Sequence, residues 1–394
     1  MKRLLEGIRV VDFGRFIAGP YAAMMLADFG ADVIRVERRE GGEDRRLGPV
    51  VETGEGGLFL NLNRNKRGMT LDPAHPLATE IVHRLVRGAD VVVANLPLDV
   101  LKKLRLDYDS LRATKDDIIL VMASAFGPDG PYRERVGFDG IAQAMSGAMN
   151  LTGFPAQPVR SIVSWVDYAT ALHAAFGALA AIYHRQQTGQ GQIVDVSLLA
   201  TSVMFMAPFL MERTLTGIVR QRIGNTGYYT APNDAYRTRD GWVVVPTIGD
   251  PMFRRWSRLV GREDLILDPR CRDDITRGDN AALINEVMTA WCAGRTRDEA
   301  IVELERARIP CGPVYELDEV VDDPQVRARH LLEETDFPGS TKPVPLGRPA
   351  VRLSRSPGDV RRGAPMLGEH TDEVRGELGF AASEIATFRR EAVI

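Results

Sequence analysis

The chain has few residues of the types that build disulfide frameworks or metal sites. Its 394 residues include three cysteines and six histidines. The cysteines form no Cys-x-x-Cys pair, and the histidines form no His-Glu-x-x-His pattern. An odd number of widely spaced thiols, Cys271, Cys292 and Cys311, predicts reduced cysteines in a reducing compartment. We therefore expect neither a disulfide framework nor a metal site.

The chain also lacks a strong excess of charge and an obvious targeting segment. A net charge of −3 argues against a general nucleic-acid binder. The first residues, MKRLLEGIRVV, are too short and too charged a stretch for a signal peptide. The apolar stretch after Asp167 is rich in alanine, contains His173 and His184, and is expected to be too short for a membrane span. These features predict a cytoplasmic protein.

Alternating strand-like and helical segments in the first two hundred residues predict an α/β fold. Apolar runs with strand character are separated by segments with helical spacing, which implies a parallel, doubly wound sheet. The expected strands are 8–13, 31–37, 69–72, 91–96, 118–127 and 193–198, and the expected helices include 19–30, 75–88 and the segment that follows Asp167.

A change of pattern near residue 201 predicts a second domain, as the length of the chain also suggests. A helix over 202–215 is followed by loop, turn and hairpin signals and then by helical segments. Residues 225–325 therefore form an expected small α+β domain, and 201–224 an expected linker. The proline-rich tail, 326–394, is expected to be extended and to pack back on the first domain, because apolar pieces such as AVRL (350–353) need cover.

The turn DFGRFIAGP (12–20) follows the first expected strand. In a doubly wound sheet, ligands bind at the carboxyl ends of the strands, so this turn faces the expected site. It lacks the Gly-x-Gly-x-x-Gly pattern of a dinucleotide site, and Pro20 suits the first turn of a helix. A tight structural turn and a ligand contact are both open here, and Arg15 favours an anionic ligand.

Residues 35–67 hold a dense group of basic side chains. Six acidic residues share the same window, so a solvated face is the simpler interpretation for any one of them. As a group beside strand ends, they are also suited to a phosphate-bearing ligand. The basic residues are Arg35, Arg38, Arg39, Arg45, Arg46, Arg64, Lys66 and Arg67.

Two aspartates precede apolar helical segments. For Asp139, an N-cap on the helix 140–149 is the favoured interpretation. For Asp167 the same interpretation competes with a catalytic one, because no other charged residue follows before Arg185 and its neighbours are Trp165, Val166 and Tyr168. A desolvated carboxylate among amide donors can act as a nucleophile. From the local pattern alone, a cap and a nucleophile both remain open.

Together these segments resemble the class III CoA-transferases, the family of formyl-CoA and carnitine-CoA transferases that also includes 2-methylacyl-CoA racemases. The resemblance covers nearly the whole chain and is most specific in its first and fourth blocks. It is carried by LLEGIRVVDFGRFIAGPYAAMMLADFGADVIRVE (4–37), NRNKRGMTLD (63–72), SAFGPDGPYRERVGFDGIAQAMSG (124–147) and VDYATALHAAFGALAAIYHRQQTGQGQIVDVSL (166–198), and more loosely by DGWVVV (240–245) and LGEHTDEV (367–374).

The resemblance implies a large Rossmann-like domain made of 1–200 and the tail 326–394, with a small domain over 225–325. It also implies an obligate homodimer in which two chains are interlocked like links. The substrates implied are an acyl-CoA and a carboxylic acid, with the coenzyme A thioester as substrate and no tightly bound cofactor. Neither nucleic acid nor membrane is an expected partner.

The family's nucleophile aligns with Asp167. The implied chemistry is attack of this carboxylate on an acyl-CoA thioester, through mixed anhydrides and an aspartyl–CoA thioester, without ATP. A hydrated carboxylate with a pKa of about 4 is a weak nucleophile, and burial would raise its reactivity. The amides at the start of the helix are expected to stabilise the developing oxyanions.

Matching by position also implies a set of coenzyme A contacts after the first four strands. Where many members of the family read ENFRPG, this chain reads ANLPLD (94–99), so an arginine contact is absent and Lys103 is the expected substitute. The glycine-rich loop of formyl-CoA transferase is reduced here to GNTGYY (224–229). The implied contacts are Arg15, Phe16, Ala18, Arg38, Leu71, Asn95, Leu96, Lys103 and Leu104.

The racemase branch of the family is a disfavoured alternative. Its proton-transfer histidine directly precedes the aspartate of the third block, and that position holds Phe138 here, which cannot accept a proton. A non-catalytic acyl-CoA-binding dimer, with Asp167 only a cap, and a nucleotide-dependent dehydrogenase are further alternatives. Arg160 could face an acceptor carboxylate, although an exposed arginine is its simpler interpretation.

Overall fold

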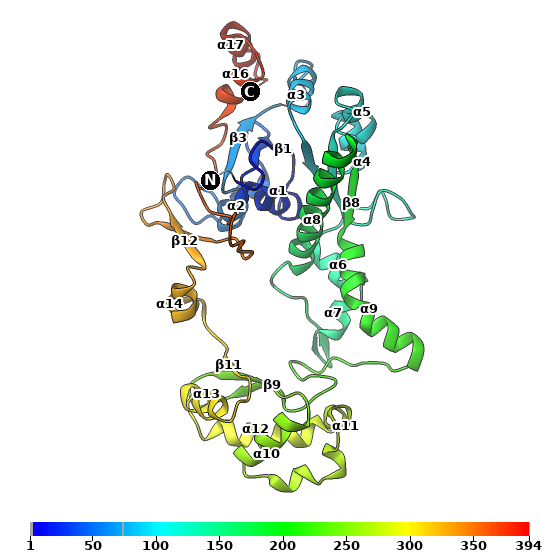
Figure 1. Cartoon of the computed structure of the whole chain (residues 1–394), viewed down its shortest axis with the longest axis vertical. Coiled ribbons are helices and arrows are strands. Elements are labelled where there is room, and N and C mark those ends of the chain that lie inside the picture. Colours follow the sequence, from blue (N-terminus) through cyan, green and yellow to red (C-terminus); the bar gives the residue numbers. More distant parts are fainter. Residues whose placement is uncertain (1–2, 73–74, 394) are drawn as a thin grey trace. The chain divides into compact units, whose positions relative to one another are not determined.

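The computed structural model describes residues 3–72 and 75–393, which form two compact units (Figure 1). The first unit consists of Met1–Ala148, Ser161–Gly217 and Val326–Ile394, and the second of Met149–Arg160 and Ile218–Gln325. Two segments differ from the expected boundaries. Residues 149–160 group with the second unit, and the segment 201–217, expected as a linker, groups with the first.

The first unit is built on a six-stranded sheet in which every neighbouring pair is parallel, as the alternating pattern predicts. The strand order β3-β2-β1-β4-β5-β8 reverses direction between β1 and β4, as in a doubly wound nucleotide-binding fold. β3 begins three residues before the expected strand. The strands are β1 (Arg9–Asp12), β2 (Asp32–Glu37), β3 (Lys66–Thr70), β4 (Val91–Ala94), β5 (Ile119–Ser124) and β8 (Ile193–Ser197).

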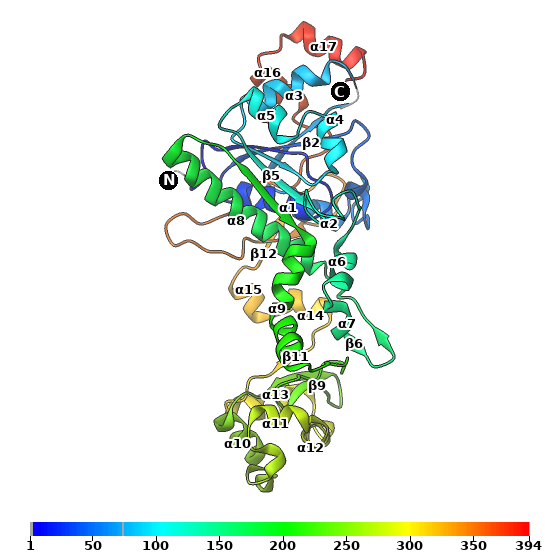
Figure 2. The same ribbon diagram turned by 90° about the vertical axis from the view of Figure 1, so that its right-hand side faces the viewer.

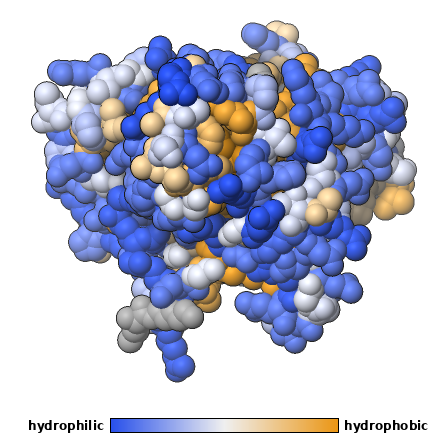
Figure 3. Space-filling model, turned by 90° about the horizontal axis from the view of Figure 1, so that it is seen from above, coloured by the Kyte–Doolittle hydropathy of each residue, from blue (hydrophilic) through white to orange (hydrophobic). Residues whose placement is uncertain are grey.

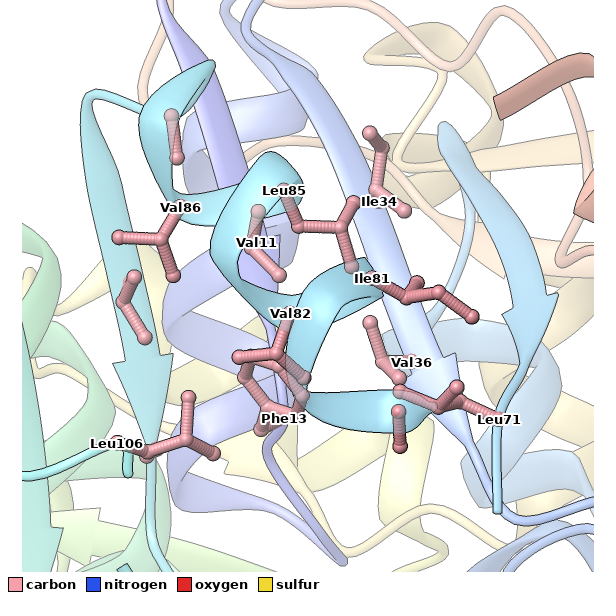
Figure 4. Close-up of a cluster of buried hydrophobic side chains, with 14 of the residues drawn as sticks. Val11, Phe13, Ile34, Val36, Leu71, Ile81, Val82, Leu85, Val86 and Leu106 are labelled. Atoms are coloured by element: carbon pink, nitrogen blue, oxygen red, sulfur yellow. The ribbon is translucent and has the colours of Figure 1, made fainter. Parts of the chain in front are cut away.

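Alternate side chains of these strands enter two separate cores, because successive residues of a strand point to opposite faces. Val11, Ile34 and Val92 pack on one face beneath α3 (Ala78–Arg87) and α5 (Tyr108–Thr114), as Figure 4 shows around α3. Val10 and Val33 pack on the other face with α1 (Ala18–Asp28) and α8 (Trp165–Thr188). Both faces are covered, which explains the almost unbroken apolar runs of the strands.

α8 packs along the sheet through a row of alanines, which lets its backbone come close to the strands (Figure 2). At Gly177 a Cβ atom would lie 2.4 Å from Val194 Cγ1, so a larger residue there would force Val194 or the helix to move. The helix has 24 residues and is long and apolar enough to cross a membrane by length and composition, so the expectation that this stretch is too short was wrong. α9 (Leu198–Thr216) meets the same criterion.

The tail contains more helix than the proline pattern indicates. Val374 in α16 (Thr371–Glu377) and Phe388 in α17 (Ala382–Arg390) belong to the same core as α3. Arg67 on β3 joins the tail to the sheet through Glu373 and Glu377, at 2.8 and 2.7 Å. The segment AVRL (350–353) is neither strand nor helix.

The first unit also contains several short elements. They are α2 (Gly57–Leu62), α4 (Leu98–Lys103), α6 (Asp139–Met145), β12 (Leu332–Thr335) and β13 (Val344–Gly347), with the 3-10 turn η1 (Glu43–Arg46). The helix α15 (Pro324–Ala328) begins in the sequence range of the second unit and ends in that of the first.

The second unit combines an antiparallel sheet with helices. Its core is built around Phe253, Trp256 and Met288, which are almost fully buried. The elements are β9 (Asn233–Arg237), β10 (Trp242–Pro246), β11 (Gly312–Pro313), α10 (Asp250–Leu259), α11 (Asp274–Asp279), α12 (Ala281–Ala293), α13 (Arg297–Arg306) and α14 (Leu317–Asp322), with the 3-10 turns η2 (Glu263–Ile266) and η3 (Pro269–Cys271) and, near residues 148–158, α7 (Ala148–Leu151), β6 (Gly153–Phe154) and β7 (Gln157–Pro158).

Most basic residues of the window 35–67 are buried and ion-paired, so a solvated face is the wrong interpretation for them. Arg35 pairs with Asp44 at 2.7 Å, and Arg64 with Asp28 at 2.7 Å. Buried cations require such partners, because an unpaired charge in the interior is strongly unfavourable. The buried basic residues are Arg35, Arg45, Arg64, Lys66 and Arg67, whereas Arg38, Arg39 and Arg46 are exposed.

Lys66 and Asp12 form a fully buried ion pair under the turn that follows β1. Lys66 Nζ donates to Asp12 Oδ2 at 2.8 Å, to Pro20 O at 2.8 Å and to Asn63 Oδ1 at 2.9 Å. Asp12 Oδ1 accepts from the amide of Gly14 at 2.7 Å. Burial lowers the pKa of Lys66 to about 8, against the raising effect of Asp12. The pair therefore fixes the turn from below.

Lys66→Ala is expected to destabilise the protein strongly. Removing one partner of a buried pair leaves Asp12 as an uncompensated charge, at a cost of about 3–5 kcal/mol in the free energy of unfolding. Denaturant unfolding of Lys66→Ala measures this cost, with Lys102→Ala as control, because Lys102 is an exposed lysine of α4. An equal, small effect of both substitutions would contradict the assigned role of the pair.

Candidate active site

The turn after β1 and the end of β4 meet at the point where the strand order reverses. Arg15 N donates to Asn95 Oδ1 at 2.6 Å, and Asn95 Nδ2 donates back to Arg15 O at 2.7 Å. Phe16 has a left-handed backbone, with φ of 61°, which is uncommon for a residue with a side chain. Its amide donates to Asp44 Oδ2 at 3.3 Å, so the conformation is held by the buried network. Ligands of doubly wound sheets bind at such a reversal point.

Asp167 lies in the first turn of α8 but is not its cap. The helix begins at Trp165, its N-cap position is Ser164, and the Ser164 side chain makes no capping hydrogen bond. Among the described residues, none of the side-chain hydrogen bonds around the start of α8 involves the Asp167 carboxylate. The interpretation of Asp167 as a simple N-cap is therefore wrong.

Asp139 supplies the cap instead, although it is 28 residues away in sequence. Its Oδ2 atom accepts from the amides of Val166, at 2.8 Å, and Asp167, at 3.2 Å. Asp139 is the first residue of α6, whose N-cap is Phe138. The expectation that Asp139 caps the helix after it was wrong, because its carboxylate turns to the free amides of α8, which a helix N-terminus leaves unpaired.

Burial and a like charge shape the electrostatics of Asp167. Burial of the partly buried side chain, followed by the charge of Asp139, raises the pKa of Asp167 to about 7. Tyr168, which packs edge-on against Tyr21 with ring centroids 5.0 Å apart, has its phenol pKa raised mainly by burial. Asp167 is therefore a poorly hydrated carboxylate, and none of the ion pairs found among the described residues includes it. Perturbed carboxylates of this kind are typical of active sites.

The first amides of α8 are already engaged. Val166 and Asp167 donate to Asp139, and Tyr168 N donates to Ser164 O at 3.1 Å. The expectation that these amides stabilise a developing oxyanion was wrong for this arrangement, because each already has an acceptor. They orient the backbone that carries Asp167.

Two arginines at the same edge, one mostly buried and one exposed, share one carboxylate. Glu43 in the turn after β2 pairs with Arg15 and also approaches Arg38, with Oε1 3.7 Å from Arg38 Nη1. Arg15 is mostly buried, and burial lowers its pKa, against the raising effect of Asp44. The side chain of Glu43 is 67% exposed. A phosphate could take the place of this carboxylate, because arginine binds both groups in the same way.

Aromatic rings line the neighbourhood of Asp139 and the start of α8. Phe138 packs edge-on against Phe16, with centroids 5.7 Å apart, and Trp165 stacks on Phe205 at 5.8 Å. Phe138 is 61% exposed, a high value for such a large apolar side chain. The structure thus brings the first turn and the third sequence block together through Phe16 and Phe138.

The other predicted coenzyme A contacts differ in their surroundings. Ala18 and Leu71 are buried, and the side chain of Leu71 belongs to the core beneath α3. Leu96 and Leu104 pack partly buried against that same core. Lys103 is an exposed residue in the last turn of α4. The structure brings together Arg15, Phe16 and Asn95, and Ala18 follows in the same turn. Arg38 is linked to Arg15 because both approach Glu43. The other four predicted contacts follow the neighbouring strands: Leu71, Leu96, Lys103 and Leu104.

In the second unit, the loop GNTGYY (224–229) packs on the segment 149–160. Tyr228 donates its hydroxyl to Gln221 O at 2.7 Å, and Gly224 N donates to Gly153 O at 2.8 Å. Arg160 is exposed, as its simpler interpretation expects. The described residues, 3–72 and 75–393, contain no group of three or more metal-ligating side chains.

Sequence reasoning missed the roles of Lys66 and Asp139. The five residues of β3 are all buried, and a lysine in such a strand needs a buried anion. The available signal was the KRGMT segment read as a strand, which would have required a partner such as Asp12. No local pattern connects Asp139 to α8, because the contact depends on how the chain folds back.

Comparisons with known proteins agree with this architecture. The model of the family described as CoA-transferase family III matches residues 5–371. A succinyl-CoA--D-citramalate CoA-transferase of Chloroflexus aurantiacus is 34% identical over 100% of this chain and 98% of its own length. A succinate--glutarate CoA-transferase of Agrobacterium fabrum is 34% identical over 95% of each chain.

A solved structure has the same fold over nearly the whole chain. The crystal structure of a CAIB/BAIF family protein from Brucella suis has a TM-score of 0.85 and 33% identity, and it covers 96% of this chain and 100% of its own. The strand order, the site at its reversal point and these full-length matches lead to one conclusion: the chain belongs to CoA-transferase family III.

Proposed function

We propose that this class III CoA-transferase works through covalent catalysis by Asp167. The observation that supports the proposal is the state of that side chain: it is partly buried, Asp139 takes over the capping of α8, and no cation among the described residues pairs with it. A carboxylate with little water around it is more reactive toward a carbonyl carbon than a hydrated one. The raised pKa leaves a substantial fraction of it ionised at pH 7.

The reaction proceeds through four balanced acyl transfers. An Asp167 oxygen attacks the carbonyl carbon of the donor thioester, the C–S bond breaks, and coenzyme A leaves that carbon as a thiolate, which gives a mixed anhydride of Asp167 and the donor acid. The thiolate then attacks the Asp167 carbonyl, which releases the donor acid and leaves an aspartyl–CoA thioester. The acceptor carboxylate attacks this thioester and expels the thiolate. Finally the thiolate attacks the acceptor's carbonyl, which restores the Asp167 carboxylate.

Coenzyme A is proposed to bind at the carboxyl edge of the sheet. The support is the position of Arg15, Phe16 and Asn95 at the reversal point, with Arg38 nearby. The phosphates of coenzyme A would meet Arg15 and Arg38 in place of Glu43. Ala18, Leu71, Leu96, Lys103 and Leu104 complete the proposed contacts, with no tightly bound cofactor.

The proposed substrates are succinyl-CoA as the donor and a second dicarboxylic acid as the acceptor. The support is that both relatives described above are named for succinyl-CoA or succinate together with a second dicarboxylic acid. Arg160 is proposed to face the second carboxylate of the acceptor. Phe138 stands where a racemase would need a proton acceptor, so racemisation is disfavoured. A non-catalytic acyl-CoA-binding protein would have no use for a partly buried carboxylate such as that of Asp167.

We further propose that two copies of the chain form an interlocked homodimer. Large apolar side chains recur on the outer side of α8 at Leu172, Phe176, Leu179 and Tyr183, with exposed fractions of 47%, 73%, 40% and 66%. This spacing makes one continuous stripe on a helix. On the face shown in Figure 3, apolar areas also interrupt the hydrophilic surface. Exposed apolar surface on this scale is typical of interfaces.

The cytoplasm is the proposed location of the enzyme. The support is that all three cysteines are free thiols, as a reducing compartment requires. Neither a membrane nor a nucleic acid is a proposed partner.

Asp167→Asn is expected to abolish CoA transfer, because an amide oxygen is not a competent nucleophile. Transfer from succinyl-CoA to a panel of dicarboxylic acids, followed by mass spectrometry of the acyl-CoA products, measures the loss. In the wild type, kcat/KM should rise with pH through about 7, since the ionised Asp167 carboxylate is the reactive form. Full activity of Asp167→Asn would refute covalent catalysis by this residue.

Glu43→Gln is expected to lower the KM for succinyl-CoA and to leave kcat nearly unchanged. The substitution removes the carboxylate that competes with the substrate phosphates for Arg15 and Arg38, an effect of about two- to fivefold for one exposed ion pair. Steady-state kinetics measure it, with Glu40→Gln, an exposed carboxylate in the same loop, as control. A KM that is unchanged in Glu43→Gln, or equally lowered by both substitutions, would contradict phosphate binding at this position.

The proposed dimer predicts a mass in solution of twice the 43.5 kDa of the chain. Light scattering coupled to size exclusion measures it directly. The mass should stay constant on dilution, because separation of interlocked chains requires unfolding. A single-chain mass at micromolar concentration would contradict the dimer.

A further inference from the structure

We infer that Asp139 is a positioning residue for catalysis: held by Gln143, it fixes the first turn of α8 and places a second carboxylate close to Asp167. The inference rests on the proposed role of Asp167 as nucleophile. It assigns a function to a buried carboxylate that the four acyl transfers do not use.

The geometry is a relay of hydrogen bonds whose members are nearly all buried. Asp139 and Gln143 are 4% and 2% exposed. Gln143 Nε2 donates to Asp139 Oδ1, and Gln143 Oε1 accepts from Ser161 N at 2.9 Å. Asp139 Oδ2 accepts from Val166 N and Asp167 N. The relay therefore connects the segment before α8 to the backbone of Asp167 itself, and every polar atom in it has a partner.

The relay has a fixed polarity of hydrogen-bond donors and acceptors. Asp139 has two acceptor oxygens for three donors, and Gln143 uses one amide N–H as a donor and its amide oxygen as an acceptor. Serine, threonine, aspartate or asparagine is the usual N-cap, supplied locally by the residue before the helix. Here Ser164 occupies that position without capping, and a charged residue from another helix does so instead. A structural cap does not require a charge, and burying a carboxylate from another helix is costly, which points to a second role.

That second role is electrostatic. Two carboxylates near one helix terminus disfavour ionisation of the one that lacks hydrogen-bond donors, which is Asp167. The titratable groups of the elements packed on this end of α8 are Tyr21 on α1, Asp139 on α6, and Tyr168 and His173 on α8 itself. After burial, Asp139 is the group whose charge raises the pKa of Asp167. A carboxylate with higher proton affinity bonds more strongly to an acyl carbon, which favours the covalent intermediates.

Asp139→Asn tests the charge and the geometry together. The asparagine oxygen still accepts from both α8 amides, so the start of the helix is retained. The new amide nitrogen, however, faces Gln143 Nε2, and two N–H donors cannot form a hydrogen bond with each other. We expect kcat to fall about tenfold or more through lost alignment. We also expect the acid limb of the kcat/KM profile to move toward lower pH by on the order of one unit, because the like charge is gone.

The double variant Asp139→Asn with Gln143→Glu separates the two effects. The introduced amide then donates to the introduced carboxylate, which also accepts from Ser161 N, so the polarity of every hydrogen bond is restored. The charge, however, lies one side chain farther from Asp167. We expect kcat to recover toward the wild-type value, whereas the acid limb lies between those of Asp139→Asn and the wild type. A merely structural cap would recover kcat without any displacement of the acid limb.

The control is Asp268→Asn in the second unit. Asp268 is the N-cap of the 3-10 turn Pro269–Cys271, so this substitution also removes the charge of a capping carboxylate. Its pH profile should match the wild type. An acid limb of Asp139→Asn that coincides with that of the wild type would overturn the inference, as would a double variant with no recovery of kcat and a wild-type melting temperature. Activity that survives Asp167→Asn would instead refute the nucleophile, so the two failures are distinguishable.

Discussion

The candidate site depends on one buried interaction, the pair of hydrogen bonds from the first amides of α8 to Asp139. A helix N-terminus carries unpaired amides, and a carboxylate in its first turn would ordinarily bond to them. Because Asp139 occupies those amides, the side chain of Asp167 has no hydrogen-bond donor among the described residues. The alanine-rich packing of α8 on the sheet then holds this carboxylate in a partly desolvated position. The reactivity proposed for Asp167 follows from these two constraints.

The arrangement lowers the stability of the fold at neutral pH. The pKa of Asp167 is about 7 in the folded chain, against about 4 for an aspartate in an unfolded chain. Between these values the folded state binds more protons than the unfolded state, so this group's contribution to stability falls as pH rises from about 4 to 7. The buried pair of Lys66 and Asp12 acts on the adjacent turn in the opposite sense, because it rigidifies the backbone that presents Arg15 and Phe16. A rigid turn beside a destabilised carboxylate is the pattern expected of a preorganised site.

Local patterns in the sequence were sufficient for the parallel sheet and the positions of its strands, since buried parallel strands read as apolar runs and the helices between them have clear spacing. They were also sufficient for the turn after β1, because its place after a strand defines its position in the fold. They were insufficient for Lys66, Arg35 and Asp139, whose partners lie far away in sequence. The two interpretations of Asp167 could not be separated from the sequence, because the residue that takes over capping is 28 positions earlier. The helices of the tail were missed because the prolines between 338 and 365 were taken as typical of the whole tail, whereas the segment after residue 365 contains none.

The central claim, that Asp167 carries the acyl and CoA intermediates, can be tested on the protein itself. Enzyme turning over succinyl-CoA is treated with hydroxylamine, digested with trypsin and analysed by mass spectrometry. Asp167 is the only side-chain carboxylate in the tryptic peptide 161–185, so a modification there identifies the residue. The account predicts a hydroxamate on this peptide that requires the donor and is absent from Asp167→Asn. An unmodified peptide from enzyme that is transferring CoA would contradict it.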